Sequence, residues 1–165
     1  MNILDQLAFR MFEYETGTPK RIQHLLKVHR FAQLIGLGEG LDEETQFTLE
    51  TAALVHDIGI KPALEKFNTD AGPYQEKEGV APAQEMLSAL GFDQKVIDRV
   101  CYLVAHHHTY VNVEGLDYRI LLEADFLVNL YEGNQSMEAV LSAKKNIFRT
   151  ATGLKILNQS YQLED

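Results

Sequence analysis

The sequence predicts an all-α fold, a single-domain helical bundle of about seven to nine helices. Three observations support this prediction. Apolar residues recur along most of the chain at the three- and four-residue spacing of amphipathic helices. Glycine and proline stand at the ends of these periodic segments, where helices begin and end. Strand signals are almost absent, the best being the short run Thr109–Val113.

The first part of the chain contains three predicted helices. An apolar stripe predicts a helix at about 2–13. Thr18-Pro19 begins the next helix, with proline near its first position, and this helix ends in the glycine-containing stretch 36–40. The third helix follows Asp42, a favourable N-cap, and we expect Gly59 and the nearby proline to close it.

The second part of the chain begins with residues 67–78, which have the weakest periodicity, and we expect them to form a loop over the site. A turn is expected at Asn112–Gly115. Further helices are predicted at about 79–90, 93–106 and 117–132, with a last helical pair at about 136–158. No repeat, low-complexity tract or linker divides the chain, so we expect one domain over residues 1–165.

The composition is that of an ordinary globular domain, with 45% hydrophobic and 24% charged residues among 165. No apolar run approaches the ~20 residues of a membrane span, and the first residues lack the basic segment of a secretory signal. A single cysteine, Cys101, is compatible with a reducing cytoplasm. A net charge of −9 disfavours duplex nucleic acid and acidic membranes. A small phosphorylated substrate stays open because bound cations reverse the field locally.

The most informative motif is His56-Asp57, near the end of the third predicted helix. Imidazole nitrogens and carboxylate oxygens are both good ligands for first-row metal ions. Further candidate ligands are His24 and Asp125, in other predicted helices, and the run His106, His107 and His108, where the helix at about 93–106 ends. Asp125 stands in a largely apolar run, where a carboxylate is costly unless it is paired or metal-bound. The pattern therefore predicts a metal site to which several helices contribute.

This pattern resembles the HD superfamily of metal-dependent phosphohydrolases, whose signature is H…HD…D along an all-helical domain. The stretch from His24 resembles the first-histidine helix of the family, 52–59 its second motif and 122–128 its terminal aspartate helix. The resemblance covers about residues 20–132 and leaves the last helical pair as a C-terminal extension. It implies that one divalent cation is held by His24, His56, Asp57 and Asp125.

The resemblance extends to His106 and His107, which look like the extra histidines of family members with two metals. Such members often carry another histidine four residues before a helix-starting glycine, where this chain has Gln75. Either Glu76 or Glu78 replaces it as an oxygen ligand, or the second site is weaker. His108, the third histidine of the run, would face the substrate as a proton donor to the leaving oxygen. The spacing leaves open which two of the three histidines bind metal.

Asp57 is the natural bridge between two cations because it directly follows another ligand. Two metals about 3.5–4 Å apart can clamp the attacking and leaving oxygens of a phosphoryl displacement, and metal-bound water ionises near neutral pH. Lys61 is either a partner for a phosphate oxygen or an ordinary helix-end lysine. We therefore assign catalytic roles to Asp57, His108 and Lys61. The metal stays open among Fe, Mn, Zn, Co, Ni and Mg, with one or two per chain.

The function expected from these features is hydrolysis of a nucleotide or another small phosphate ester through a metal-bound hydroxide. Two alternatives remain open: a di-iron oxygenase on the same scaffold, and a non-catalytic domain that senses a nucleotide. The complete set of four ligands counts against the sensor. The chain lacks the GYP motif of cyclic-dinucleotide enzymes and any other signature of one substrate. The sequence also leaves a homodimer open.

Overall fold

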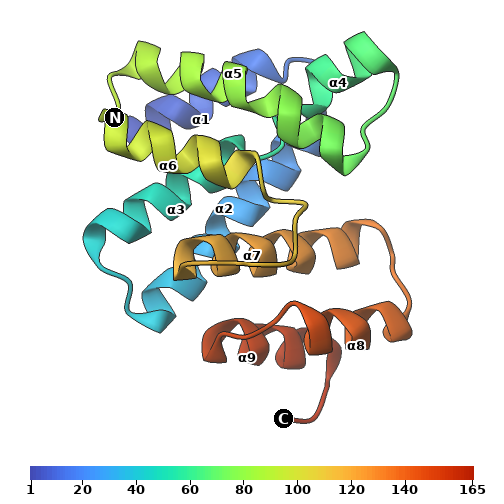
Figure 1. Ribbon diagram of the computed structural model, residues 1–165. Helices are drawn as coiled ribbons and strands as arrows, with labels where there is room; N and C mark the ends of the chain where they lie inside the picture. The colour runs from blue at the N-terminus through green and yellow to red at the C-terminus, as the bar shows by residue number, and fades with distance from the viewer.

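The computed structural model describes residues 1–165 and contains nine α-helices and no strand, which confirms the predicted all-α fold (Figure 1). No helix combines the length and the apolar character that a membrane crossing requires. The helices are α1 (Ile3–Tyr14), α2 (Pro19–Glu39), α3 (Glu43–Val55), α4 (Ile60–Phe67), α5 (Gly72–Leu90), α6 (Gln94–Val104), α7 (Leu116–Glu132), α8 (Met137–Asn146) and α9 (Ala151–Tyr161).

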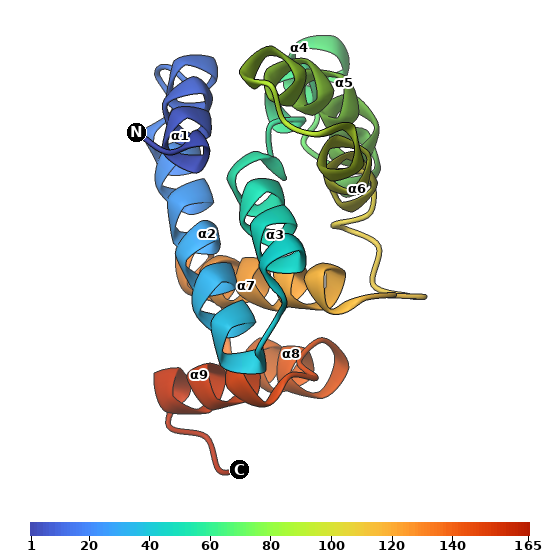
Figure 2. The same ribbon diagram turned by 90° about the vertical axis from the view of Figure 1, so that its left-hand side faces the viewer.

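Two helices form the middle of the bundle. α3 contacts α1, α2, α6 and α7 (Figure 2). Every residue of α3 from Thr48 to Val55 is buried. In α7 the run from Ile120 to Asp125 is also buried. A helix that is buried on all sides must be apolar on all sides, apart from polar groups that find partners. In Figure 1, α7 lies between the N-terminal helices and the α8–α9 pair.

The starts of the predicted helices are confirmed where capping residues mark them. Pro19 is the first residue of α2, and Gly40 ends this helix with a left-handed φ of +71°. The side chain of Asp42 accepts a hydrogen bond from the backbone N–H of Thr45 at 2.9 Å, which caps α3. These local signals set the starts of α2, which carries His24, and of α3, which leads into His56 and Asp57.

The end of the third helix differs from the prediction. α3 stops at Val55, so His56 and Asp57 lie in a turn between α3 and α4 rather than inside a helix. Gly59 has an ordinary right-handed φ of −70° and is required for another reason. A Cβ atom there would lie 2.2 Å from the carbonyl oxygen of Gln75 and 2.7 Å from the backbone nitrogen of Gly79. The missing side chain therefore lets α5 pack directly against this turn.

We expect Gly59→Ala to destabilise the protein by about 1–3 kcal/mol, because the added methyl group forces the α5 backbone away from the turn. Chemical denaturation followed by circular dichroism measures this change. An unchanged midpoint would mean that the two backbones do not approach as closely as described.

The prediction of a loop at residues 67–78 is wrong. α5 begins at Gly72, and only residues 68–71 separate it from α4. In the first two turns of α5 the buried residues are Gln75 and Gly79, four positions apart on one face. Neither is apolar, so the buried face of this segment gave no hydrophobic periodicity.

The segment between α6 and α7 also differs from the prediction. α6 ends at Val104, so the three histidines lie in the turn that follows, and the strand considered at 109–113 does not form. The hydroxyl of Tyr118 donates to the carbonyl oxygen of His106 at 2.9 Å, which ties this turn to α7. At the other end of the domain, buried Glu123 accepts hydrogen bonds from Arg149 and Thr150 and ties α7 to the start of α9.

Candidate metal centre

Four side chains from three parts of the chain converge in the core. His24 comes from α2, His56 and Asp57 from the turn after α3, and Asp125 from α7. All four are buried, and their ligand atoms lie within 4.8 Å of one another. The Nε2 atom of His24 lies 3.1 Å from both carboxylates, and that of His56 lies 3.5 Å from Asp57 and 3.4 Å from Asp125. We call these four residues the first cluster.

The first cluster has the spacing that a metal site needs. Ligands about 2.1 Å from a cation are separated by roughly 3.0–3.4 Å along the edges of an octahedron or a tetrahedron. The observed separations of 3.1–3.5 Å fall close to this range, including 3.4 Å between the Nε2 atoms of His24 and His56. Two imidazoles and two carboxylates are also a donor set that suits several divalent ions. The residues present therefore fit a divalent cation.

Backbone carbonyl groups fix the orientation of two of the imidazole rings, those of His56 and His107. Nδ1 of His56 lies 2.9 Å from the carbonyl oxygen of Ala53, and Nδ1 of His107 lies 2.8 Å from that of Val104. Because a carbonyl oxygen can only accept a hydrogen bond, Nδ1 must carry the proton in both rings. When Nε2 carries no proton, its lone pair faces the carboxylates, and this is the form of the ring that binds a metal.

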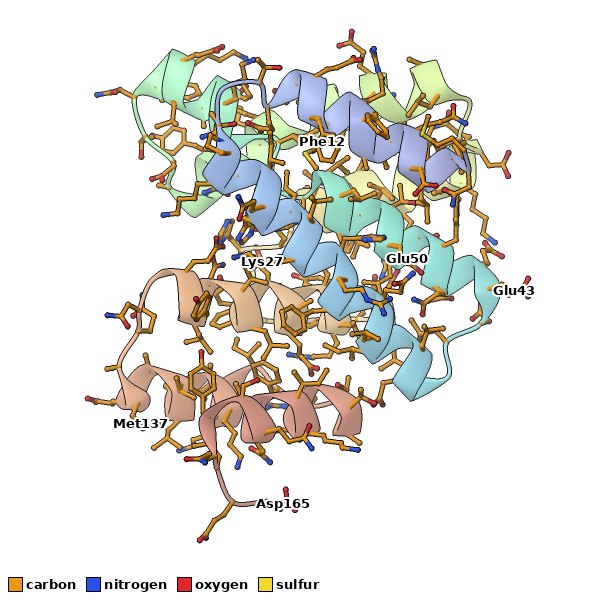
Figure 3. All side chains as sticks on the ribbon, turned by 180° about the vertical axis from the view of Figure 1, so that it is seen from behind. Phe12, Lys27, Glu43, Glu50, Met137 and Asp165 are labelled. Atoms are coloured by element: carbon orange, nitrogen blue, oxygen red, sulfur yellow. The ribbon has the colours of Figure 1, made fainter.

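Glu132 performs the same task for His24; from the sequence alone it could be either a partner of the metal ligands or a plain surface residue. Its carboxylate lies 2.6 Å from Nδ1 of His24 and 3.2 Å from Nζ of Lys27. Figure 3 shows Lys27 on α2 where this helix passes α7. Glu132 follows Asp125 by two helical turns on the same face of α7, and this spacing favours the role of a partner to the metal ligands.

The ionisation of the first cluster depends on its internal contacts. Burial opposes the protonation of His24, but the adjacent Asp125 and Asp57 carboxylates outweigh it and raise the pKa of His24 to about 11. Burial would raise the pKa of Asp57, but the charge of His56 and the hydrogen bond to His107 hold it well below its usual range. The pKa of Asp125 is likewise lowered, against burial, by His24 and His56. Without a cation, a proton on His24 therefore offsets part of the negative charge of these two carboxylates.

We expect the affinity for a divalent cation to rise with pH between about 6 and 8.5, because the proton on His24 must leave before Nε2 can bind. One displaced proton corresponds to about a tenfold increase in affinity per pH unit below its pKa. In metal-free protein, rising pH has the opposite effect: it lowers the contribution of His24 to stability. A raised histidine pKa gives stability that is complete below about 6.5, the unfolded value, and is lost as pH rises toward 11.

Calorimetric titration with Mn²⁺ at several pH values tests the first expectation, and thermal unfolding in a chelator tests the second. An affinity that does not change with pH would contradict the protonated state of His24 described above.

A second group of ligands shares Asp57 with the first. Asp57, His107 and His108 have ligand atoms within 4.8 Å of one another, and Nε2 of His107 lies 3.1 Å from the Asp57 carboxylate. We call these three residues the second cluster. Burial and the neighbouring His107 lower the pKa of His108. A neutral imidazole suits a metal ligand better than the proton donor that we had expected at this position.

Gln75 lies where the sequence resemblance suggested an extra histidine. Its side-chain oxygen is 2.9 Å from Nε2 of His108, so it contacts the second cluster. Glu76, expected as a replacement ligand, instead accepts hydrogen bonds at 2.9 Å from the backbone N–H of His108 and the hydroxyl of Thr109. Glu76 therefore holds the turn after α6 in place, outside both clusters.

Two further assignments differ from the structure. His106, expected to bind the second cation, stacks on Tyr102 with its Nδ1 atom 2.7 Å from the Tyr102 carbonyl oxygen. It lies outside both clusters, since consecutive residues in a turn point in different directions. Lys61, expected to contact phosphate, donates to the backbone carbonyl oxygen of Tyr14 at 3.1 Å, and its ammonium group lies over the Tyr14 ring.

A pocket of about 450 Å³ opens onto the first cluster. His24, Asp57, Gln75 and His108 line it on the metal side. The basic groups at this pocket are Lys20 and Arg21, which stand in the first turn of α2. The sequence analysis did not assign them, although each precedes His24 by about one helical turn, a spacing that places them near the same face. We call this the metal pocket.

Comparisons with known proteins agree with this geometry. The family model described as HD domain matches residues 21–143. A solved structure, the crystal structure of a predicted HD superfamily hydrolase from an uncultured Thermotogales bacterium, is similar with a TM-score of 0.67 and 25% identity, over 97% of this chain and 83% of that one. No curated protein matches the chain. Since the family model covers most of the chain and the buried histidines and aspartates follow its order, this protein belongs to the HD-domain family.

Proposed function

We propose that this protein is a metal-dependent phosphohydrolase acting on a nucleotide or another small phosphate ester. The observation that carries the proposal is the position of Asp57, whose carboxylate belongs to both clusters and lines the metal pocket. A shared carboxylate is how proteins hold two divalent cations close together. The name of the similar solved structure, a predicted hydrolase, supports the same class of reaction.

The residues divide the work between holding cations and holding substrate. The first cluster would bind one divalent cation, and the second cluster would bind another. When bound, such cations supply an acidified water and neutralise charge on phosphoryl oxygens. Asp57 would fix their separation, while Glu132 and the carbonyl oxygens of Ala53 and Val104 keep the imidazoles in the binding orientation.

Arg21 is well placed to hold a phosphate at the rim of the metal pocket. Its Nε atom donates to Glu15 at 2.8 Å, and Glu15 is fully buried, so the guanidinium is fixed in position. No other hydrogen bond occupies the two terminal nitrogens, which leaves a planar fork for a phosphate oxygen pair. Lys20, beside it, adds a second positive charge at a pocket whose lining also includes the carboxylates of Asp57, Asp70 and Glu132.

The test is an anaerobic screen of phosphorylated metabolites with protein loaded separately with Mn²⁺, Co²⁺, Zn²⁺ or Fe²⁺. We expect phosphate release from at least one ester and its loss in excess chelator. In a parallel assay with oxygen present, oxygen uptake by the iron form without phosphate release would indicate an oxygenase instead. Tight nucleotide binding with no turnover under any metal would indicate a sensor.

A further inference from the structure

A second hollow lies beside the metal pocket, between α7 and α8. This groove of about 350 Å³ has an apolar floor formed by buried Leu130, Ala143 and Ile147 together with half-buried Phe126. Its polar lining consists of neutral amide and hydroxyl groups: Asn129, Gln135, Ser142 and Asn146. None of the side chains that line it is charged.

The groove adjoins the metal pocket because Asn129 and Gln135 line both. The amide nitrogen of Asn129 donates to the Asp125 carboxylate at 3.0 Å. One side chain therefore contacts the first cluster and borders the groove at the same time. Asn129 follows Asp125 by one turn of α7, so the helix itself sets this arrangement.

A second chain of contacts links the groove to the second cluster. The ring of Phe126, in the groove, packs edge-on against Tyr110 with centroids 5.3 Å apart. The Tyr110 hydroxyl lies 3.4 Å from Nδ1 of His108. The groove thus borders the candidate metal centre through two independent contacts.

We infer that the α7–α8 groove binds the organic part of the substrate, and that this part is a flat, uncharged ring with hydrogen-bonding groups, as in a nucleobase. An apolar floor with a few neutral donors and acceptors is the usual lining of such a pocket, and 350 Å³ lies within the roughly 300–1,000 Å³ typical of small-molecule sites. The phosphate would then lie in the metal pocket. This inference rests on the proposed function and names the substrate class for it.

The test uses the full-length protein, labelled with ¹⁵N and titrated with adenosine, guanosine, cytidine, uridine and ribose. These nucleosides lack a phosphate, so the result does not depend on hydrolysis. We expect at least one nucleoside to shift amide resonances of residues 126–130 and 135–147, at an affinity at least about tenfold higher than ribose. Failure of all four nucleosides to bind there would overturn the inference even if the metal-loaded protein hydrolyses esters.

Two matched variants locate the site. Ser142→Trp fills the groove, whereas Leu141→Trp adds the same side chain at a neighbouring position that is 50% exposed and does not line it. We expect nucleoside binding to be lost in the first variant and kept in the second. Ala139→Leu, a smaller intrusion, should weaken binding and guards against misfolding of the tryptophan variant. Equal effects of the two tryptophans, in folded proteins, would overturn the inference.

Where a nucleotide proves to be hydrolysed, the same pair gives a kinetic test. Ser142→Trp should reduce the preference for the nucleotide over ribose 5-phosphate, measured as the ratio of kcat/KM, at least about tenfold. Leu141→Trp should leave this ratio unchanged. Absence of hydrolysis by the wild type would count against the proposed function, and the nucleoside titration would still decide the role of the groove.

Discussion

Asp57→Asn is expected to lose nearly all phosphatase activity and most bound metal. The amide keeps the shape of the side chain but removes the charge and most of the ability to bridge two cations. Changing an outer-shell partner of a metal ligand typically costs 10–100-fold, so loss of the shared ligand should cost at least about a hundredfold in turnover. Elemental analysis together with the rate of phosphate release measures both effects.

The matched control is Glu123→Gln, which changes a buried carboxylate that is not a candidate metal ligand. Glu123 accepts hydrogen bonds from Arg149 and Thr150 and contacts neither cluster. We expect this variant to be less stable but to keep its metal and turnover. Wild-type turnover in Asp57→Asn would show that the shared carboxylate has no part in the reaction.

The second large effect is a contrast between neighbouring histidines. His107→Ala is expected to abolish binding of the second cation and to reduce turnover at least about a hundredfold, because a direct ligand is lost. His106→Ala should retain both, since this ring stacks on Tyr102 outside the clusters. Calorimetric titration with Mn²⁺ and steady-state kinetics compare the two variants.

The opposite result for these two variants would contradict the assignment of His107 as a ligand. Equal losses in the two variants, or a larger loss in His106→Ala, would mean that the turn after α6 adopts another arrangement when metal is bound. His107 would then not be the residue that pairs with Asp57.

The ligands of the first cluster could be predicted from the sequence because each stands out from its surroundings. His56, Asp57 and Asp125 are polar residues within apolar, buried runs, where only a partner or a cation makes them tolerable. Their order also matches a family pattern, which added His24. The helix starts were predictable for a similar reason, since Pro19 and Asp42 act locally.

The surroundings of the second cluster could not be predicted in the same way. Spacing along a helix says which residues share a face, but the three consecutive histidines follow the end of α6 and have no helical period. Glu76 and Gln75 lie in the first turns of α5, where the buried residues are not apolar, so the directions of their side chains depend on the packing of α5 against Gly59. Such contacts are set by the tertiary fold and leave no local trace.

The most direct measurement is anomalous diffraction from crystals of the protein soaked in Mn²⁺. The proposed metal centre predicts a strong peak among His24, His56, Asp57 and Asp125, and a second, weaker peak next to Asp57, His107 and His108. Each ligand atom should lie about 2.0–2.3 Å from its peak. Mn²⁺ bound only elsewhere on the protein, with both clusters empty, would contradict the assignment of this site as a metal centre.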